Sequence, residues 1–171
     1  MLVILVVVIL CMIFGGGSWK TPINNVMDVL NDGDGKAYEE LMPPYYKDMA
    51  DALDGIIDIS DEDFDEEAEN QRDRLTKKYG DDAEISYEVV KKTEVDSDDI
   101  DSYNEVSDVA SILSSKKAKK YKLTKAYKVK IKYTIEGEDA DKTDKTTVIV
   151  GKMDGTWVLL DEGDLPISTG F

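Results

Sequence analysis

The stretch 121–136 alternates apolar and charged side chains, and this pattern constrains the fold more than any other part of the chain. One parity carries the apolar side chains of Tyr121, Leu123, Tyr127, Val129, Ile131, Tyr133 and Ile135. The other parity carries Lys122, Lys128, Lys130 and Lys132. Because successive side chains of a strand point to opposite faces of its sheet, the pattern predicts a long β-strand. We expect one face of this strand to be core and its lysine face to meet water.

Helical spacing dominates before this strand, and more strands follow it. Apolar residues at helical spacing, separated by Gly and Pro, predict helices over 21–30, 34–41, 45–53 and 61–79. A strand over 83–89, a helix over 97–114 and two strands over 146–152 and 157–160 come next, the last two joined by Asp154-Gly155. Helices first and antiparallel strands afterwards predict an α+β domain whose N-terminal helices pack on one face of a curved antiparallel sheet.

The first nineteen residues carry no charge, and Met1 to Phe14 are apolar without interruption. A run of this length is typical of a signal peptide or of a membrane anchor. Trp19 followed by Lys20 resembles a membrane edge, whereas three consecutive glycines, 15–17, suit signal-peptidase cleavage. We therefore expect a signal peptide or membrane anchor over 1–19, the α+β domain over 20–161 and an irregular tail over 162–171.

Two features of this leader leave alternatives open. No Lys or Arg precedes the apolar run, so either Met1 is not the true start or the segment is a trimmed transmembrane helix of a longer protein. Cys11, the only cysteine, is either a lipid-attachment site or one more small hydrophobic residue, and Leu10 fits the lipidation motif poorly. We expect an extracytoplasmic domain that is membrane-anchored, or secreted if the leader is cleaved.

Composition excludes several classes of chemistry. The chain has no histidine, which removes Ser-His and Cys-His nucleophile pairs and the usual zinc ligand. Its net charge of −16 repels nucleic-acid phosphate, so we expect no nucleic-acid partner. We predict no cofactor. Any catalysis has to rest on Asp, Glu, Lys or Tyr.

Two acidic stretches invite a calcium interpretation, but neither fits the spacing of an EF-hand loop. Aligning Gly35 with the loop glycine places Leu30 and Leu41 at ligand positions, and aligning Gly33 with it again places Leu30 at one. The second stretch, 61–65, places an arginine at the last ligand position. Helix caps and helix-start acids explain both stretches better, and we predict no metal site.

The order of the predicted elements resembles the NTF2-like (cystatin-like) superfamily, and in particular small secreted or membrane-anchored bacterial domains of that type. The residues that carry the resemblance are Thr21-Pro22, Asp32-Gly33-Asp34, Tyr38, Leu41-Met42-Pro43 and the closing Lys152-Met153-Asp154-Gly155-Thr156-Trp157. The resemblance covers roughly residues 21–161. It implies a cone-shaped curved sheet, which in some members holds an isomerase or dehydratase pocket. No catalytic residue of those members matches a position in this chain.

Two candidate sites follow from the strand pattern. Tyr127, Tyr133 and Trp157 are candidates to line a pocket inside the sheet, although an ordinary core explains them as well. Lys122, Lys128, Lys130 and Lys132 are candidates for a partner face, although lysines also protect exposed strands from aggregation.

Three functional hypotheses remain. The first is a non-catalytic extracytoplasmic domain on a membrane anchor, which binds a small ligand or an envelope component. The second is an enzyme of the isomerase or dehydratase type with an Asp or Glu base and a Tyr donor, whose mark is a buried carboxylate facing Tyr. The third is a sensory or regulatory ectodomain of a longer membrane protein.

Overall fold

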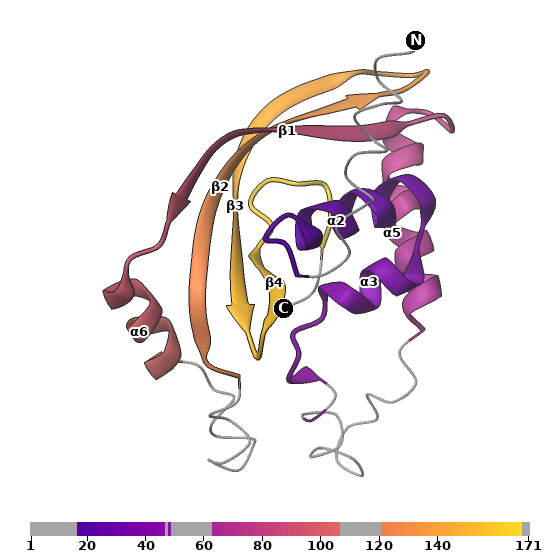
Figure 1. Ribbon diagram of the computed structural model, residues 1–171. Helices are drawn as coiled ribbons and strands as arrows, with labels where there is room; N and C mark the ends of the chain where they lie inside the picture. Colours follow the sequence, from indigo (N-terminus) through magenta and orange to yellow (C-terminus); the bar gives the residue numbers. More distant parts are fainter. Residues whose placement is uncertain (1–16, 47, 49–62, 107–120, 169–171) are drawn as a thin grey trace.

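The computed structural model describes residues 17–46, 48, 63–106 and 121–168. Its elements are α2 (Thr21–Asp32), α3 (Gly35–Leu41), α5 (Phe64–Tyr79), β1 (Glu84–Glu94), α6 (Ser97–Val106), β2 (Leu123–Glu136), β3 (Lys142–Met153) and β4 (Thr156–Asp161). The four strands form one antiparallel sheet in the order β1-β2-β3-β4. The sheet curves around α2, α3 and α5, and α6 lies on its outer side (Figure 1). The predicted α+β class with an antiparallel sheet is confirmed.

Parts of several predictions fall outside the described residues: residues 1–16 of the leader over 1–19, with Cys11, most of the helix over 45–53, and the second half of the helix over 97–114. Within the part of the chain that the structure describes, no helix is long and apolar enough to cross a membrane.

Aspartates begin two of the helices. The Asp34 carboxylate accepts a hydrogen bond from the Ala37 backbone N–H at 3.1 Å, and α3 starts there. The Asp63 carboxylate accepts from the N–H groups of Asp65 and Glu66, each at 3.1 Å, and starts α5. These side chains satisfy N–H groups that a helix leaves unpaired in its first turn. Both candidate calcium stretches therefore contain helix caps.

The helix α2 begins without a side-chain cap. Thr21 is the first helical residue, and its backbone N–H donates to the Ser18 carbonyl at 2.9 Å. Lys20 occupies the cap position without a side-chain hydrogen bond. Pro22 still lies in the first turn, where its missing N–H costs nothing. The helix ends at Gly33, whose φ of 65° is left-handed.

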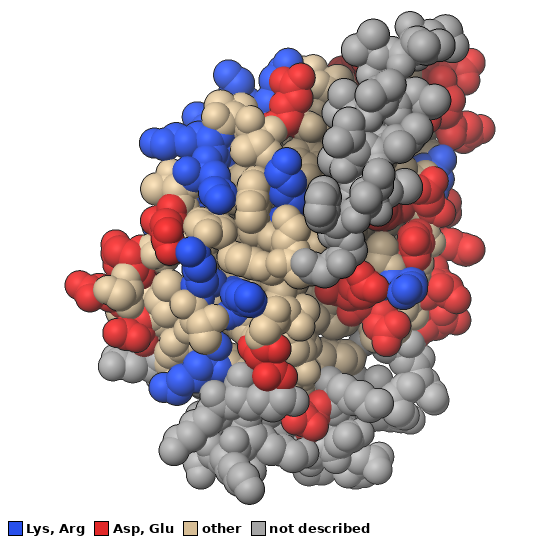
Figure 2. All heavy atoms as spheres, in the orientation of Figure 1, with Lys and Arg blue, Asp and Glu red and all other residues tan. Residues whose placement is uncertain are grey.

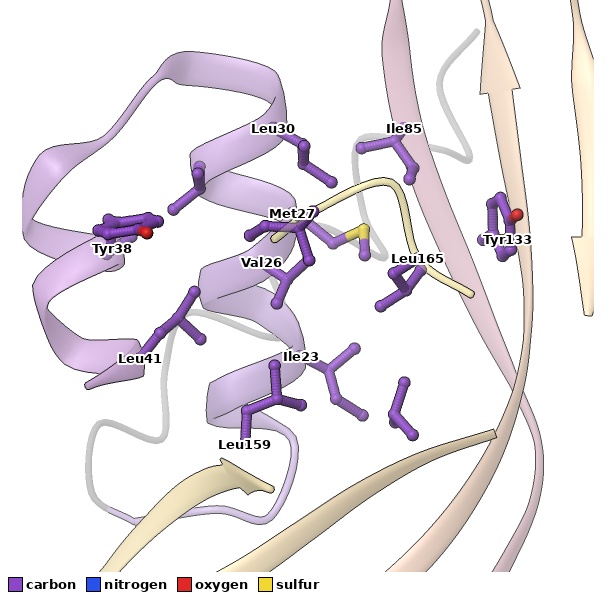
Figure 3. Close-up of a cluster of buried hydrophobic side chains, with 14 of the residues drawn as sticks. Ile23, Val26, Met27, Leu30, Tyr38, Leu41, Ile85, Tyr133, Leu159 and Leu165 are labelled. Atoms are coloured by element: carbon purple, nitrogen blue, oxygen red, sulfur yellow. The ribbon is translucent and has the colours of Figure 1, made fainter. Parts of the chain in front are cut away.

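The core fills the concave side of the sheet. Ile23 and Leu30 of α2 and Tyr133 of β2 are fully buried. Figure 3 shows side chains of α2, including Ile23 and Met27, directed toward the sheet and toward Leu165 of the C-terminal segment. Full burial of one such apolar side chain contributes about 1.5–3 kcal/mol, so this face dominates the stability of the domain.

A bulge at the start of β2 overturns part of the predicted alternation. The register passes from Leu123, opposite Met153, to Lys125, opposite Lys152, so Thr124 is an extra residue. Leu123 therefore leaves the face that carries Tyr127 and joins a second apolar cluster on the outer side of the sheet. That cluster consists of Leu123, Ala126, Met153 and Val158, with Tyr45, Val95, Ile100 and Leu160 packed against it. Lys125, two residues before Tyr127, stays on the concave side with it.

The second half of β1 is exposed on both faces. Every residue from Glu88 to Glu94 is exposed, and Val89, which the alternation predicts to be half-buried, is 38% exposed. A register shift between Val89 and Lys91 interrupts the pleat, and the described helices lie over the start of β1 rather than its end (Figure 1). The concave side of the sheet is therefore open to solvent next to this end of β1.

The described segment after β4, residues 162–168, is irregular, but it belongs to the core. Leu165 and Ile167 are 5% and 7% exposed. The Gln71 side chain of α5 donates to the Ser168 carbonyl at 3.1 Å and accepts from the Ser168 N–H at 3.2 Å. The Asp164 N–H donates to Thr146 Oγ1 at 2.8 Å. These bonds join the chain end to a helix and a strand far away in sequence.

Candidate functional site

Only two of the three aromatic residues predicted to line a pocket lie together. Tyr127 of β2 and Trp157 of β4 stack with ring centroids 5.3 Å apart and planes 14° apart. Tyr133 lies six residues farther along β2, at about 20 Å for a strand rise of about 3.3 Å per residue. The structure therefore does not bring Tyr127, Tyr133 and Trp157 together in a single pocket.

Tyr133 is a structural residue of the core. It is fully buried, and its hydroxyl donates to the Asp164 carbonyl at 3.3 Å and accepts from Lys142 Nζ at 2.6 Å. The hydrogen bond to Tyr133 raises the pKa of Lys142 above its usual range. The phenol thus helps to hold the C-terminal segment against β2.

Around Tyr127 the structure assembles an aromatic cluster, by which we mean Trp19, Tyr127 and Trp157. Trp19 approaches the Tyr127 ring edge-on, with centroids 6.2 Å apart and planes 71° apart. Trp19 lies just before α2, so the cluster joins the N-terminal segment to two strands. Geometries of this kind add about 0.5–1.5 kcal/mol per pair to the burial of the rings.

Lysines surround this aromatic cluster. Lys92 Nζ lies 4.3 Å from the Tyr127 ring centroid and 4.9 Å from that of Trp19. Lys125 Nζ lies 5.2 Å from the Tyr127 centroid, and Lys20 Nζ lies 5.5 Å from the Trp19 centroid. Cations within about 6 Å of a ring face are attracted by its quadrupole. Sequence reasoning missed Lys92, because the register shift in β1 turns it toward the aromatic rings. Lys125 lies two residues before Tyr127 and therefore shares its face by simple alternation.

The second candidate surface is on the outer side of the sheet. We call it the lysine face, and it consists of Lys91, Lys128, Lys130, Lys132 and Lys145. After the bulge at the start of β2 the alternation is regular. It places Lys128, Lys130 and Lys132 on the face opposite Tyr127, as predicted. Lys122 precedes β2, and the bulge breaks the alternation that related it to the other three.

Cross-strand pairing concentrates positive charge on the lysine face. Lys130 is the register partner of Lys91 in β1, and Lys132 is the partner of Lys145 in β3. Like charges directly opposite each other are unfavourable, by an amount comparable with the roughly 0.2–1 kcal/mol of a favourable pair. Glu88 of β1 is the register partner of Lys132 and places a negative charge beside this face. Lys128 also forms an ion pair with Asp99 of α6 at 3.5 Å.

The two signs of charge are segregated on the molecule. In Figure 2, blue atoms gather at the left over the sheet, and red atoms predominate at the right, where α5 lies, and at the lower left near α6. The positive sheet surface is thus an exception on a chain whose net charge is −16.

A pocket of about 180 Å³ lies beside the second apolar cluster, and both Val158 and Leu159 of β4 border it. Its lining includes Tyr45, Tyr103, Met153, Leu160 and Glu162. Burial raises the pKa of both tyrosine hydroxyls, so they are neutral at physiological pH. None of the three aromatic residues expected to line a pocket borders this one.

No carboxylate is buried among the described residues, whose buried polar side chains are those of Asn25, Gln71 and Thr146. The pKa of the Asp28 carboxyl is raised, chiefly by partial loss of water and then by the charges of Asp32, Asp34 and Glu40. The Asp28 side chain nevertheless reaches the surface. The same residues contain no group of acids, cysteines or histidines that could hold a metal ion. The Tyr121 hydroxyl donates to the Asp48 carboxylate at 2.6 Å, but Asp48 is only half-buried, so the fully buried carboxylate that marks the enzyme hypothesis is not found among the described residues.

Compared with known proteins, the chain matches no family model, no curated protein and no solved structure.

Proposed function

We propose that this chain is a non-catalytic, extracytoplasmic binding domain on a membrane anchor, and that its lysine face binds a phosphate-bearing polyanion of the cell envelope. The observation that carries the proposal is the pairing of Lys91 with Lys130 and of Lys132 with Lys145 on an exposed sheet face. The NTF2-like resemblance belongs to this proposal and draws support from a curved antiparallel sheet with helices on its concave side. The anchor rests on the apolar run of Met1 to Phe14.

The geometry of the lysine face suits an extended anion better than a single small one. Lys128, Lys130 and Lys132 recur every second residue, at about 7 Å for a rise of about 3.3 Å per residue. Lys91 and Lys145 widen the row by one strand on each side, at about 4.8 Å per strand. A polymer with repeating phosphates can contact several ammonium groups at once, and it relieves the repulsion between paired lysines.

The acidic remainder of the domain limits which polyanions can bind. A net charge of −16 opposes a bulky polyanion such as a nucleic-acid duplex, because its phosphates extend beyond the lysine face. A thin linear chain that stays on the sheet avoids this repulsion. We therefore expect linear polyphosphate, used as the probe, to bind more tightly than duplex DNA.

The test is a calorimetric titration of the full chain with long-chain inorganic polyphosphate, which measures its affinity. The variant K128Q/K130Q/K132Q removes three charges from the face and should lower affinity at least about tenfold, or about 1.4 kcal/mol. Binding should also weaken steeply between about 50 mM and about 200 mM salt, because it releases counterions.

The matched control is K36Q/K77Q/K78Q, which removes the same charge from exposed positions of α3 and α5. It should retain wild-type affinity. The proposal is wrong if the wild-type chain does not bind polyphosphate, or if both triple variants lose affinity equally. Tighter binding of duplex DNA than of polyphosphate would point instead to a nucleic-acid partner.

A further inference from the structure

We infer that the aromatic cluster, with the lysines around it, docks against the headgroup layer of a bilayer containing anionic lipid, and that this contact turns the lysine face away from the membrane. The inference rests on the membrane anchor of the proposed function and adds to it an orientation, a docking surface and a lipid class.

The composition of the surface fits the edge of a membrane. Trp and Tyr are enriched at membrane–water interfaces, and lysines lie there with their stems among apolar groups and their ammonium groups among headgroups. Both tryptophans of the chain, Trp19 and Trp157, belong to the aromatic cluster. Lys20 and Lys92 are exposed, and Trp19 and Tyr127 are half-buried, so the cluster is reached from solvent.

The charge of the surface favours anionic headgroups. Lys20, Lys92 and Lys125 lie within 5.5 Å of an aromatic ring centroid of the cluster. Lys152 is the register partner of both Lys125 and Trp157 and therefore shares their face. Glu94 pairs with Lys125 at 3.1 Å and offsets one of these four positive charges. The local charge is thus positive on an acidic protein.

Chain length places this surface near the membrane. The apolar run ends at Phe14, five residues before Trp19. Five residues span at most about 18 Å, at about 3.6 Å per residue. If the run lies in the bilayer, Trp19 cannot be farther than this from the edge of the hydrocarbon, and the headgroup region itself occupies about 5–8 Å of that distance. The aromatic cluster is consequently the part of the described domain that is tied most closely to the membrane.

The strand geometry then sets the direction of the other candidate surface. Tyr127 points to the concave side of the sheet and Lys128, the next residue, to the outer side. A membrane on the concave side near the end of β1 therefore leaves the lysine face directed into the envelope. The domain would hold a polyanion on one face of β2 and lipid on the other.

The two tryptophans allow a direct test. The full chain is reconstituted into vesicles of phosphatidylcholine, with or without phosphatidylglycerol, that contain a lipid with a nitroxide on its headgroup. We expect the nitroxide to quench tryptophan fluorescence strongly, and more strongly when phosphatidylglycerol is present. In K20Q/K92Q/K125Q, the ratio of docked to undocked domain should fall about fivefold per lysine, and quenching should lose its dependence on phosphatidylglycerol.

Two controls locate the contact. The variant T147W keeps both native tryptophans and adds a third at an exposed position on the lysine side of β3, and the added fluorescence should be quenched little. The variant K128Q/K130Q/K132Q should be quenched like the wild type while it loses polyphosphate binding. Conversely, K20Q/K92Q/K125Q should keep polyphosphate binding, which also shows that it is folded.

The outcomes separate this inference from the function on which it rests. A chain that floats with vesicles but shows equal quenching at Trp19, Trp157 and Trp introduced at Thr147 overturns the docking and leaves the anchor standing. Equal quenching with and without phosphatidylglycerol overturns the choice of anionic lipid. A chain that does not float with vesicles overturns both the anchor and the docking, whereas polyphosphate binding is judged independently.

Discussion

The joint between Gln71 and Ser168 offers a sharp test of how the C-terminal segment is held. Gln71 is 2% exposed, and its amide forms two hydrogen bonds with the Ser168 backbone, at 3.1 and 3.2 Å. The variant Q71L keeps the bulk of the side chain and removes both bonds. At about 0.5–1.5 kcal/mol per bond, we expect a loss of about 1–3 kcal/mol in the free energy of unfolding.

Thermal unfolding and urea titration measure this loss. For a chain of this size, about 1 kcal/mol corresponds to about 2–4 °C in Tm, so Q71L should lower Tm by about 2–12 °C. Hydrogen exchange should show that the Ser168 amide is protected in the wild type and exposed in Q71L. The control is N70A, at an exposed neighbouring position of the same helix. If N70A and Q71L have the same Tm and the Ser168 amide exchanges equally in both, the hydrogen bonds do not hold the segment and our reasoning is refuted.

Two further substitutions test the packing of the sheet. In G151A, the new Cβ would meet Leu123 Cδ1 and Leu160 Cδ1. Overpacking should therefore lower the free energy of unfolding by about 1–3 kcal/mol, as measured by urea titration. Recovery of that free energy in L123A/G151A would support this cause, and an undiminished urea midpoint in G151A would contradict it. In Y133F, the hydrogen bond that raises the pKa of Lys142 is lost. A raised lysine pKa stabilises the fold below the unfolded value of about 10.5, and this contribution is lost as pH rises through the folded pKa. The stability gap between wild type and Y133F should therefore narrow above about pH 10.5 in a series of pH-dependent melts, and a gap that widens there would exclude this linkage.

Local patterns predicted most of the elements correctly. Alternation along 121–136 indicated β2 and the outward direction of Lys128, Lys130 and Lys132, because a strand has only two faces. Asp34 and the acids near 61–65 indicated helix starts, because a short carboxylate satisfies N–H groups within its own turn. These predictions depend on neighbours a few residues away, and such neighbours are visible in any sequence.

Contacts between distant residues account for the parts that sequence reasoning missed. The extra residue at Thr124 moves Leu123 to the outer face of the sheet, and its position depends on the hydrogen-bond register with β3. Val89 is exposed because the helices cover only the start of β1. Tyr127 stacks on Trp157 across β3, which lies between their strands, so their grouping depends on the strand order. The separation of Tyr127 from Tyr133 follows from the length of β2.

The amino-acid sequence alone establishes the uncharged N-terminal run, the absence of histidine chemistry, the α+β order and a strand with lysines on one face. Those properties follow from composition and from the periodicity of the backbone. The tertiary structure alone assembles Trp19, Lys92 and Tyr127 into one surface, pairs lysines across strands and joins Gln71 to Ser168. Each of these depends on register and packing between segments separated by tens of residues, where small backbone irregularities redirect side chains that local periodicity assigns to the opposite face.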